Sequence, residues 1–159
     1  MSKSAVIRLK PLLLSLLIPL VAGGLSGILT SGSMQLYQNI KKPPLSPPGW
    51  VFPVVWTVLY LCMGIAAYLI FTSESVYKGR ALVLYGAQLV VNLLWPVFYF
   101  NLEWRLFSFV WLVLLFVLVL VMTVCFFRIN SAAGYLMLPY ILWLLFAGYL
   151  NLATWLLNR

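Results

Sequence analysis

The sequence predicts an all-α membrane protein in which a bundle of five transmembrane helices forms a single domain over residues 1–159. Apolar residues make up 65% of the chain and charged residues only 8%, with a mean hydropathy of +1.08. Soluble domains carry about 25% charged residues, so this chain has too few polar side chains to cover a soluble surface. Its apolar residues form five runs, each long enough to cross a hydrocarbon core of about 30 Å: about 11–29, 47–71, 79–100, 106–127 and 132–157.

The first run, 11–29, follows basic residues and so resembles a secretion signal. Its length of roughly 19 residues exceeds the 7–15 residues of a typical signal-peptide core, which favours a helix that stays in the membrane. Gly23 and Gly27 are four residues apart and lie on one face of this helix. Small residues at this spacing predict a close approach by a neighbouring helix.

The connection over 30–46 reads TSGSMQLYQNIKKPPLS and is longer than the other three. Residues 34–41 can form a short helix capped by Ser33, and Pro43 and Pro44 then hold the chain extended into the next span. A simple connection between helices would need only a few residues. We therefore interpret 30–46 as a candidate lid over one end of the bundle, with a mere connector as the alternative.

The later spans contain Pro53, Pro96 and Pro139. Membrane helices tolerate proline because neighbouring helices satisfy the freed carbonyl groups. No run alternates polar and apolar residues with a period of two, so a β-barrel is not indicated. Five spans place the N- and C-termini on opposite sides of the membrane. The basic residues divide almost evenly between the two sides, so the orientation stays open.

The charged residues exclude several kinds of chemistry. The chain has no histidine, and its two acidic residues, Glu74 and Glu103, lie in polar breaks between the spans. Acid–base catalysis by a buried carboxylate or imidazole and a histidine-based metal site therefore lack their parts, and we expect no enzyme of ordinary type, no metal and no cofactor. Cys62 and Cys125 lie within apolar runs and are expected to be core residues. The net charge of +8 favours anionic membrane lipids as partners over nucleic acid.

Polar and aromatic residues gather in the membrane half beneath 30–46. Three spans carry them as stripes along one helix face: Gln88, Asn92, Trp95 and Tyr99; Trp143, Ala147 and Asn151; Pro53, Trp56 and Tyr60. Amides that face lipid are costly, so these stripes should point into the bundle. Two interpretations stay open, either hydrogen bonds between helices or an aromatic pocket for a flat hydrophobic ligand. Trp104 and Trp155, near span ends, are expected in the interfacial belt.

Three motifs resemble the translocator protein family, also called tryptophan-rich sensory proteins or peripheral benzodiazepine receptors, and a bacterial-type member in particular. The motifs are PPGWVFPVVWTVLY from Pro47, QxxxNxxWPxxYF from Gln88 and PYxxWxxFAxxLN from Pro139. The resemblance implies a five-helix bundle, commonly a homodimer. Its pocket beneath the first loop would take porphyrins, benzodiazepine-site drugs and, in animal members, cholesterol. The pocket-lining positions it implies are Trp50, Asn92, Trp95, Trp143, Ala147 and Leu150.

The resulting expectation is an integral membrane receptor or carrier for a porphyrin-like tetrapyrrole, in a bacterial membrane. The resemblance also offers an enzyme-like alternative, light-dependent porphyrin degradation through Trp143. A ligand-free membrane scaffold is the third possibility. This chain departs from the family pattern in carrying Leu45 in place of a loop tryptophan, Trp111 in place of an acidic residue and Val83 in place of a small residue that helps dimer packing in some members.

Overall fold

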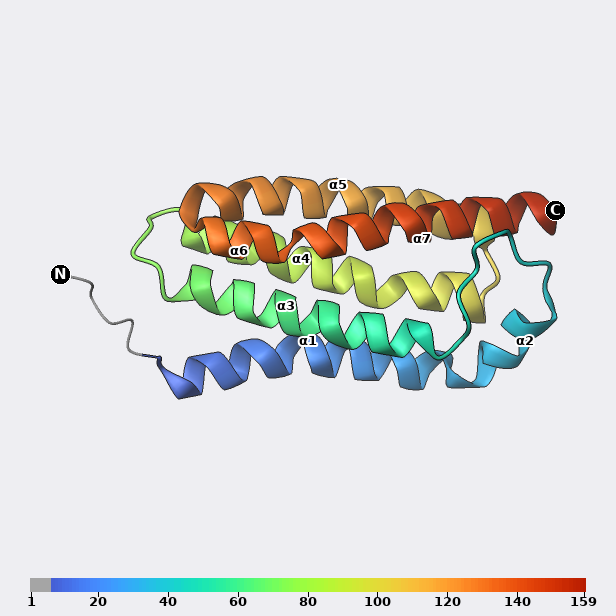
Figure 1. Cartoon of the computed structure of the whole chain (residues 1–159), viewed down its shortest axis with the longest axis horizontal. Helices are drawn as coiled ribbons and strands as arrows, with labels where there is room; N and C mark the ends of the chain where they lie inside the picture. The colour runs from blue at the N-terminus through green and yellow to red at the C-terminus, as the bar shows by residue number, and fades with distance from the viewer. Residues whose placement is uncertain (1–6) are drawn as a thin grey trace.

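The computed structural model describes residues 7–159, which form an elongated bundle of helices (Figure 1). Five helical segments are long and apolar enough to cross a membrane, so the predicted all-α fold is confirmed. The elements along the chain are α1 (Leu9–Thr30), η1 (Ser31–Ser33), α2 (Met34–Asn39), α3 (Val51–Phe71), α4 (Lys78–Pro96), η2 (Val97–Asn101), α5 (Arg105–Ile129), α6 (Ser131–Leu136) and α7 (Leu138–Leu157).

The second span begins later than predicted, at Val51 and not at Pro47. The residues just before it form a turn, closed by a hydrogen bond from the Val51 N–H to the Pro48 carbonyl (3.0 Å). A residue that precedes proline is disfavoured in the helical conformation, so the Pro47–Pro48 pair delays the start of α3.

The fifth span is divided, whereas the sequence predicted one helix over 132–157. Helix α6 ends at Leu136 and α7 starts at Leu138, with Met137 between them. Pro139 accounts for the break, because its nitrogen has no hydrogen to donate and its ring crowds the preceding turn. The Met137 N–H bonds to the Gly134 carbonyl instead (3.1 Å), which tightens the end of α6.

Packing within the bundle places α1 mainly against α3 and places α5 between α4 and α7 (Figure 1). The core consists of fully buried side chains contributed by these helices, among them Met63, Val119, Met122, Phe126 and Tyr140. Leucine, isoleucine and valine side chains on the outer faces are exposed. This pattern fits helices that face lipid on the outside and one another on the inside.

The contact between α1 and α3 depends on two glycines. A Cβ atom on Gly64 would lie 2.7 Å from the Ser15 carbonyl oxygen, so no larger residue fits there without displacing α1. Gly23 packs directly against the ring of Tyr60. Gly27 has no described neighbour within 4 Å of a Cβ position. The predicted close approach at Gly23 and Gly27 is therefore found at Gly23, and the other essential glycine lies on α3.

The long connection covers the end of the bundle at which α1, α4 and α7 finish and α3 and α5 begin (Figure 1). It contains the predicted short helix, α2, which ends at Asn39 and not at residue 41. Ser33 precedes α2 but does not cap it, because its hydroxyl donates to Oδ1 of Asn101 (2.8 Å). The lid, residues 30–46, is thus tied to the end of the third span.

Candidate functional site

A cluster of aromatic side chains fills the bundle directly beneath the lid. The ring of Tyr37, on α2, lies 6.2 Å from Phe52 on α3 and 5.6 Å from Phe100 in η2, measured between centroids. Tyr37, on the lid, therefore contacts both α3 and η2. We refer to this group as the lid cluster: Tyr37, Phe52, Trp56, Trp95, Tyr99, Phe100, Trp143 and Phe146.

Trp143 lies at the centre of the part of this cluster formed by α3 and α7. Its ring centroid is 6.0 Å from that of Phe52, 6.5 Å from Trp56 and 5.6 Å from Phe146. Its indole Nε1–H is buried and has no hydrogen-bond partner among the described residues. An unpaired buried donor costs about 1–3 kcal/mol, so such groups are rare in native proteins and call for an explanation.

A layer of buried amides and phenols lies deeper in the bundle and joins α3, α4 and α7. The Nδ2 atom of Asn92 donates to the Tyr140 hydroxyl (2.7 Å), which in turn donates to Oε1 of Gln88 (3.0 Å). The Tyr60 hydroxyl donates to Oδ1 of Asn92 (3.3 Å). All four side chains are buried, so this layer holds the helices in register from inside the membrane. The nearby Tyr85 hydroxyl is buried without a partner among the described residues.

Asn151 forms a second polar junction, between α4, α5 and α7. Its Oδ1 accepts from the Trp95 indole N–H and from the Ser108 hydroxyl, both at 3.2 Å. Its Nδ2 donates to the Arg105 carbonyl at 2.8 Å. This carbonyl belongs to the start of α5. The amide of Asn151 therefore acts as a link between helices, which is the first of the two interpretations of these stripes.

The structure brings most of the predicted pocket residues into one membrane half. Asn92, Ala147 and Leu150 are buried, and Trp95 and Trp143 belong to the lid cluster. The side chain of Trp50, in the turn before α3, is 68% exposed and does not belong to the lid cluster. Its contact with a ligand stays a prediction.

The lid is held closed mainly by α7. Asn158 makes two hydrogen bonds with the backbone of Lys41, accepting from its N–H (3.0 Å) and donating to its carbonyl (2.8 Å). The Tyr149 hydroxyl donates to the Pro44 carbonyl (2.9 Å). We call Asn158 and Tyr149 the latch. Between the latched segment and α3, Leu45 adopts a positive φ of 68° and is 81% exposed, a strained position for a residue with a Cβ.

The space beneath the closed lid is almost filled. A cavity of about 10 Å³ remains between the lid and the ends of α4 and α5, lined by Ser33, Tyr37, Ile40, Tyr99, Phe100, Glu103 and Arg105. This volume is close to the minimum that holds one water molecule. Burial, with a smaller effect from the Tyr99 phenol, raises the pKa of Tyr37 to about 12, so Tyr37 is neutral at physiological pH. A ligand can enter only after the lid and some rings move.

A second aromatic group lies outside the bundle at the same end, and we call it the belt cluster: Phe98, Trp104, Phe107 and Trp111. Trp104 is 54% exposed, as expected for an interfacial residue, and stacks on Phe98 with a centroid distance of 6.3 Å. The Trp111 indole N–H donates to the Val91 carbonyl on α4 (2.8 Å). No aromatic contact between the belt cluster and the lid cluster occurs among the described residues.

Comparison with known proteins adds independent information. A family model described as TspO/MBR matches residues 15–156, which is most of the chain. The chain belongs to the TspO/MBR family. It is 34% identical to the tryptophan-rich protein TspO of Archaeoglobus fulgidus over 148 residues, covering 92% of this chain and 96% of the relative. It is 34% identical to protein CrtK of Rhodobacter capsulatus (86% of each chain) and 31% identical to the translocator protein of Bos taurus (90% of this chain, 87% of the relative).

Membership of the TspO/MBR family establishes an integral membrane protein with five apolar helices. The structure also places two of the residues at which the sequence departs from the expected family pattern. Trp111 supplies a donor across the α4–α5 contact through its bond to Val91, so an interhelical link is present at this position. Val83 is 72% exposed on the outer face of α4.

Several residues of the site were not identified from the sequence. Tyr37 and Phe52 contact each other only because α2 folds back over α3, and Asn158 contacts Lys41 across 117 residues of sequence. None of these contacts follows a helical periodicity. The sequence did contain Tyr37 in the middle of the loop and Asn158 after the last span. An aromatic residue in a loop and an amide after a helix are both too common to predict a contact.

Proposed function

We propose that this chain is a membrane receptor or carrier that binds a flat, hydrophobic, tetrapyrrole-like ligand among the rings of the lid cluster. The observation that carries the proposal is the buried indole N–H of Trp143, which has no partner among the described residues. A carbonyl or carboxylate oxygen of a ligand would accept this hydrogen bond. The ligand would thereby relieve an energetic cost that the free protein bears.

The composition of the cluster supports a flat ligand. Aromatic rings stack on planar ligands through their faces, and such contacts contribute about 0.5–1.5 kcal/mol beyond the area they bury. Phe52, Trp56 and Trp143 offer such faces on α3 and α7, and the small side chain of Ala147 lies one turn beyond Trp143. Benzodiazepine-site drugs, which are also largely aromatic and apolar, are further candidate ligands of this site.

Binding also requires the lid to open, because the cavity beneath it is small. Breaking the latch bonds Asn158–Lys41 and Tyr149–Pro44 leaves no polar group buried without a partner, because both bonds lie at exposed positions where water can replace them. The strain at Leu45 favours movement of the segment next to α3. We therefore propose that ligand exchange is controlled by release of the latch.

We propose binding and not catalysis as the activity. Of the chain's two acidic side chains, Glu74 lies at the opposite end of the bundle, and Glu103, which lines the small cavity beneath the lid, is paired with Arg105 at 2.9 Å. Two of the relatives cited above are named for tryptophan content and for translocation, and none of the three names denotes an enzyme. We further propose that the chain acts as a homodimer in a bacterial membrane, as the resemblance to bacterial members implies.

The test is a titration of the purified chain in detergent with protoporphyrin in the dark, followed by quenching of tryptophan fluorescence. Saturable binding of one protoporphyrin per chain is the expected result. Absence of saturation would contradict the proposal and favour a scaffold without a ligand. Repeating the titration under light distinguishes the enzyme-like alternative, which requires loss of the porphyrin absorption and formation of a product in proportion to the protein.

A further inference from the structure

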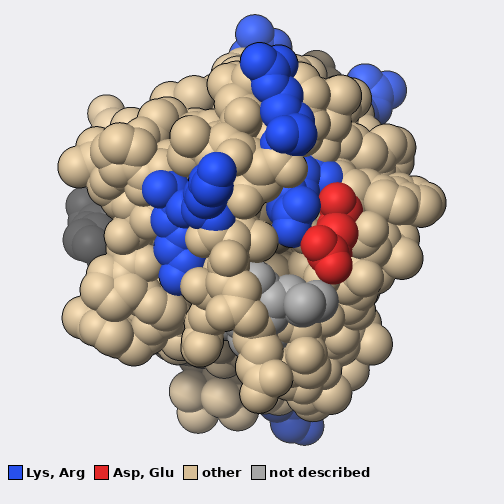
Figure 2. Space-filling model, turned by 90° about the vertical axis from the view of Figure 1, so that its right-hand side faces the viewer, with Lys and Arg blue, Asp and Glu red and all other residues tan. Residues whose placement is uncertain are grey.

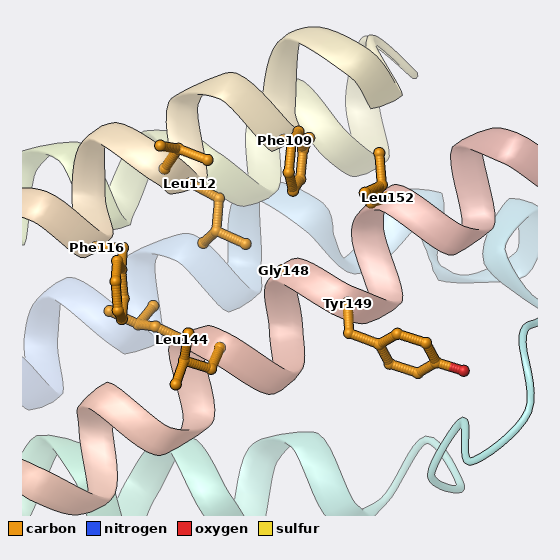
Figure 3. Close-up of a pocket in the computed structure, with 9 residues that line it drawn as sticks. Phe109, Leu112, Phe116, Leu144, Gly148, Tyr149 and Leu152 are labelled. Atoms are coloured by element: carbon orange, nitrogen blue, oxygen red, sulfur yellow. The ribbon is translucent and has the colours of Figure 1, made fainter.

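An apolar hollow lies on the outer face of the bundle and not beneath the lid. It is a groove of about 260 Å³ between α5 and α7 (Figure 3). Its walls are almost wholly apolar: Phe109, Leu112, Val113, Phe116, Leu144, Leu145, Gly148, Tyr149 and Leu152. In Figure 3, Phe109 and Phe116 lie along α5 on one side, and Gly148 lies on α7 opposite them. The lid cluster is a separate site with a separate set of residues.

Gly148 creates this groove. A Cβ atom built on Gly148 would meet only Leu112 Cδ2, at 3.9 Å, which is an ordinary van der Waals contact. Gly64, by contrast, is required because α1 backbone atoms lie within 2.8 Å of its Cβ position. Helix packing therefore does not require a glycine at 148. Because Gly148 has no side chain, an open apolar space remains there on the outer surface of the bundle.

The shape and chemistry of the groove fit one hydrocarbon chain. Ligand pockets for drug-sized molecules usually have about 300–1,000 Å³ and several placed polar groups. This groove is smaller, and Tyr149 is its one lining residue with a polar side chain, whose hydroxyl is already bonded to the Pro44 carbonyl. An acyl chain of a membrane lipid needs no polar partner along its length.

Basic residues lie where the head group of such a lipid would be. Trp155 follows Leu152 by three residues and Gly148 by seven, so it continues the groove face of α7 toward the end of the bundle. The guanidinium of Arg159 lies 5.8 Å from the centre of the Trp155 ring. Lys41 is exposed beside α7, held there by Asn158. Figure 2 shows several basic side chains on this end of the molecule, with acidic atoms at one place.

The charges favour a lipid over a second copy of the chain as the occupant. The chain has two acidic residues. Glu103 is bonded to Arg105, and Glu74 lies between α3 and α4 at the opposite end of the bundle. A second copy packed side by side would therefore bring no free acidic side chain to Arg159 and Lys41. The phosphate of an anionic lipid would supply that charge.

We propose that the groove between α5 and α7 is a binding site for an anionic phospholipid. One acyl chain lies against Gly148 between Phe109, Phe116 and Leu152, and the phosphate is held by Arg159 and Lys41. This site uses none of the residues of the lid cluster. It would anchor the end of α7, which carries the latch, to the surrounding membrane.

The experiment is native mass spectrometry of the full chain in detergent with added phosphatidylglycerol or phosphatidylcholine of identical acyl chains. We expect one phosphatidylglycerol per chain to be retained in preference to phosphatidylcholine. Gly148→Leu fills the groove and should reduce retention of both lipids, whereas Gly24→Leu, on an open face of α1, should not. Arg159→Gln and Lys41→Gln should each lower the preference for phosphatidylglycerol roughly fivefold. Arg80→Gln at the far end should leave it unchanged.

Equal retention of the two lipids by the unmodified chain would overturn the proposal. So would full lipid retention by Gly148→Leu. A fall in the dimer fraction of Gly148→Leu with unchanged lipid retention would assign the groove to contact between copies and would also contradict it. If Gly148→Leu does not fold, Gly148→Ala replaces it, because its Cβ fits beside Leu112. It should fold and show a partial loss of lipid.

Discussion

The lid cluster and the belt cluster lie at the same end of the bundle and both contain tryptophan and phenylalanine rings, yet the hydrogen bonding of Trp143 in one differs from that of Trp111 in the other. In the belt cluster the Trp111 indole bonds to the Val91 carbonyl, and Trp104 is exposed to the head-group region. In the lid cluster the Trp143 indole is buried without a partner among the described residues. The lid covers one group, whereas the other lies on the outer face of the bundle.

This difference separates a structural use of tryptophan from a binding use. A tryptophan whose N–H is satisfied within the protein or at the interface contributes packing and anchoring. A tryptophan whose N–H is buried and unpaired carries a cost that only another molecule can remove. Residue type and position near a span end do not distinguish the two cases. For Trp143 and Trp111, the hydrogen-bond partner of the indole does.

The largest expected effect on ligand affinity comes from removing an aromatic ring of the lid cluster, with removal of a belt-cluster ring as the control. Trp143→Ala removes both a stacking face and the free donor, so protoporphyrin affinity should fall roughly tenfold or more. Trp95→Ala should also weaken binding, because it removes another ring of the lid cluster. Trp104→Ala is the matched control in the belt cluster and should bind like the unmodified chain. Equal affinities for all three variants in a fluorescence titration would show that the ligand binds elsewhere.

A second effect concerns the polar layer beneath the lid cluster. Tyr140→Phe removes a hydroxyl that accepts from Asn92 and donates to Gln88, and it leaves both amides buried with one bond fewer. We expect a loss of stability of about 1–2 kcal/mol. Thermal unfolding in detergent measures it, and Tyr135→Phe, at an exposed position on α6, is the control. An unchanged melting temperature for Tyr140→Phe would mean that this layer does not hold the helices together.

A smaller effect is expected from the latch. Asn158→Ala removes two hydrogen bonds to Lys41, both at an exposed position where water compensates in part. We predict roughly threefold faster association and dissociation of protoporphyrin, since each exposed bond contributes less than about 1 kcal/mol. Stopped-flow fluorescence measures both rates. Rates that do not change would show that the lid opens without releasing Asn158.

The five spans could be predicted from the sequence because apolar runs of sufficient length have few other structures available in a membrane. The grouping of Asn92, Trp95 and Trp143 followed from helical periodicity together with the number of spans. The break at Met137 did not follow, because proline in a membrane helix is compatible with several backbone geometries. The exposure of Trp50 and the latch at Asn158 depend on how the lid folds back, which no local pattern encodes.

The smallest predicted effect lies in the belt cluster. Trp111→Phe removes the bond to the Val91 carbonyl but keeps an aromatic ring between α4 and α5. Hydrogen bonds between membrane helices contribute about 0.6 kcal/mol on average, so the melting temperature should fall only slightly. Protoporphyrin affinity should not change. A large loss of affinity in this variant would remove the distinction between the two clusters.

The most direct test of the central claim compares Trp143→Phe with Trp111→Phe in the same dark titration with protoporphyrin. Each substitution keeps an aromatic ring and removes one indole N–H. If the Trp143 donor serves the ligand, Trp143→Phe weakens binding roughly fivefold, because a hydrogen bond contributes about 1 kcal/mol, and leaves the protein at least as stable as before. Trp111→Phe shows the opposite pattern, with unchanged affinity and slightly lower stability. Unchanged affinity in Trp143→Phe would contradict the account.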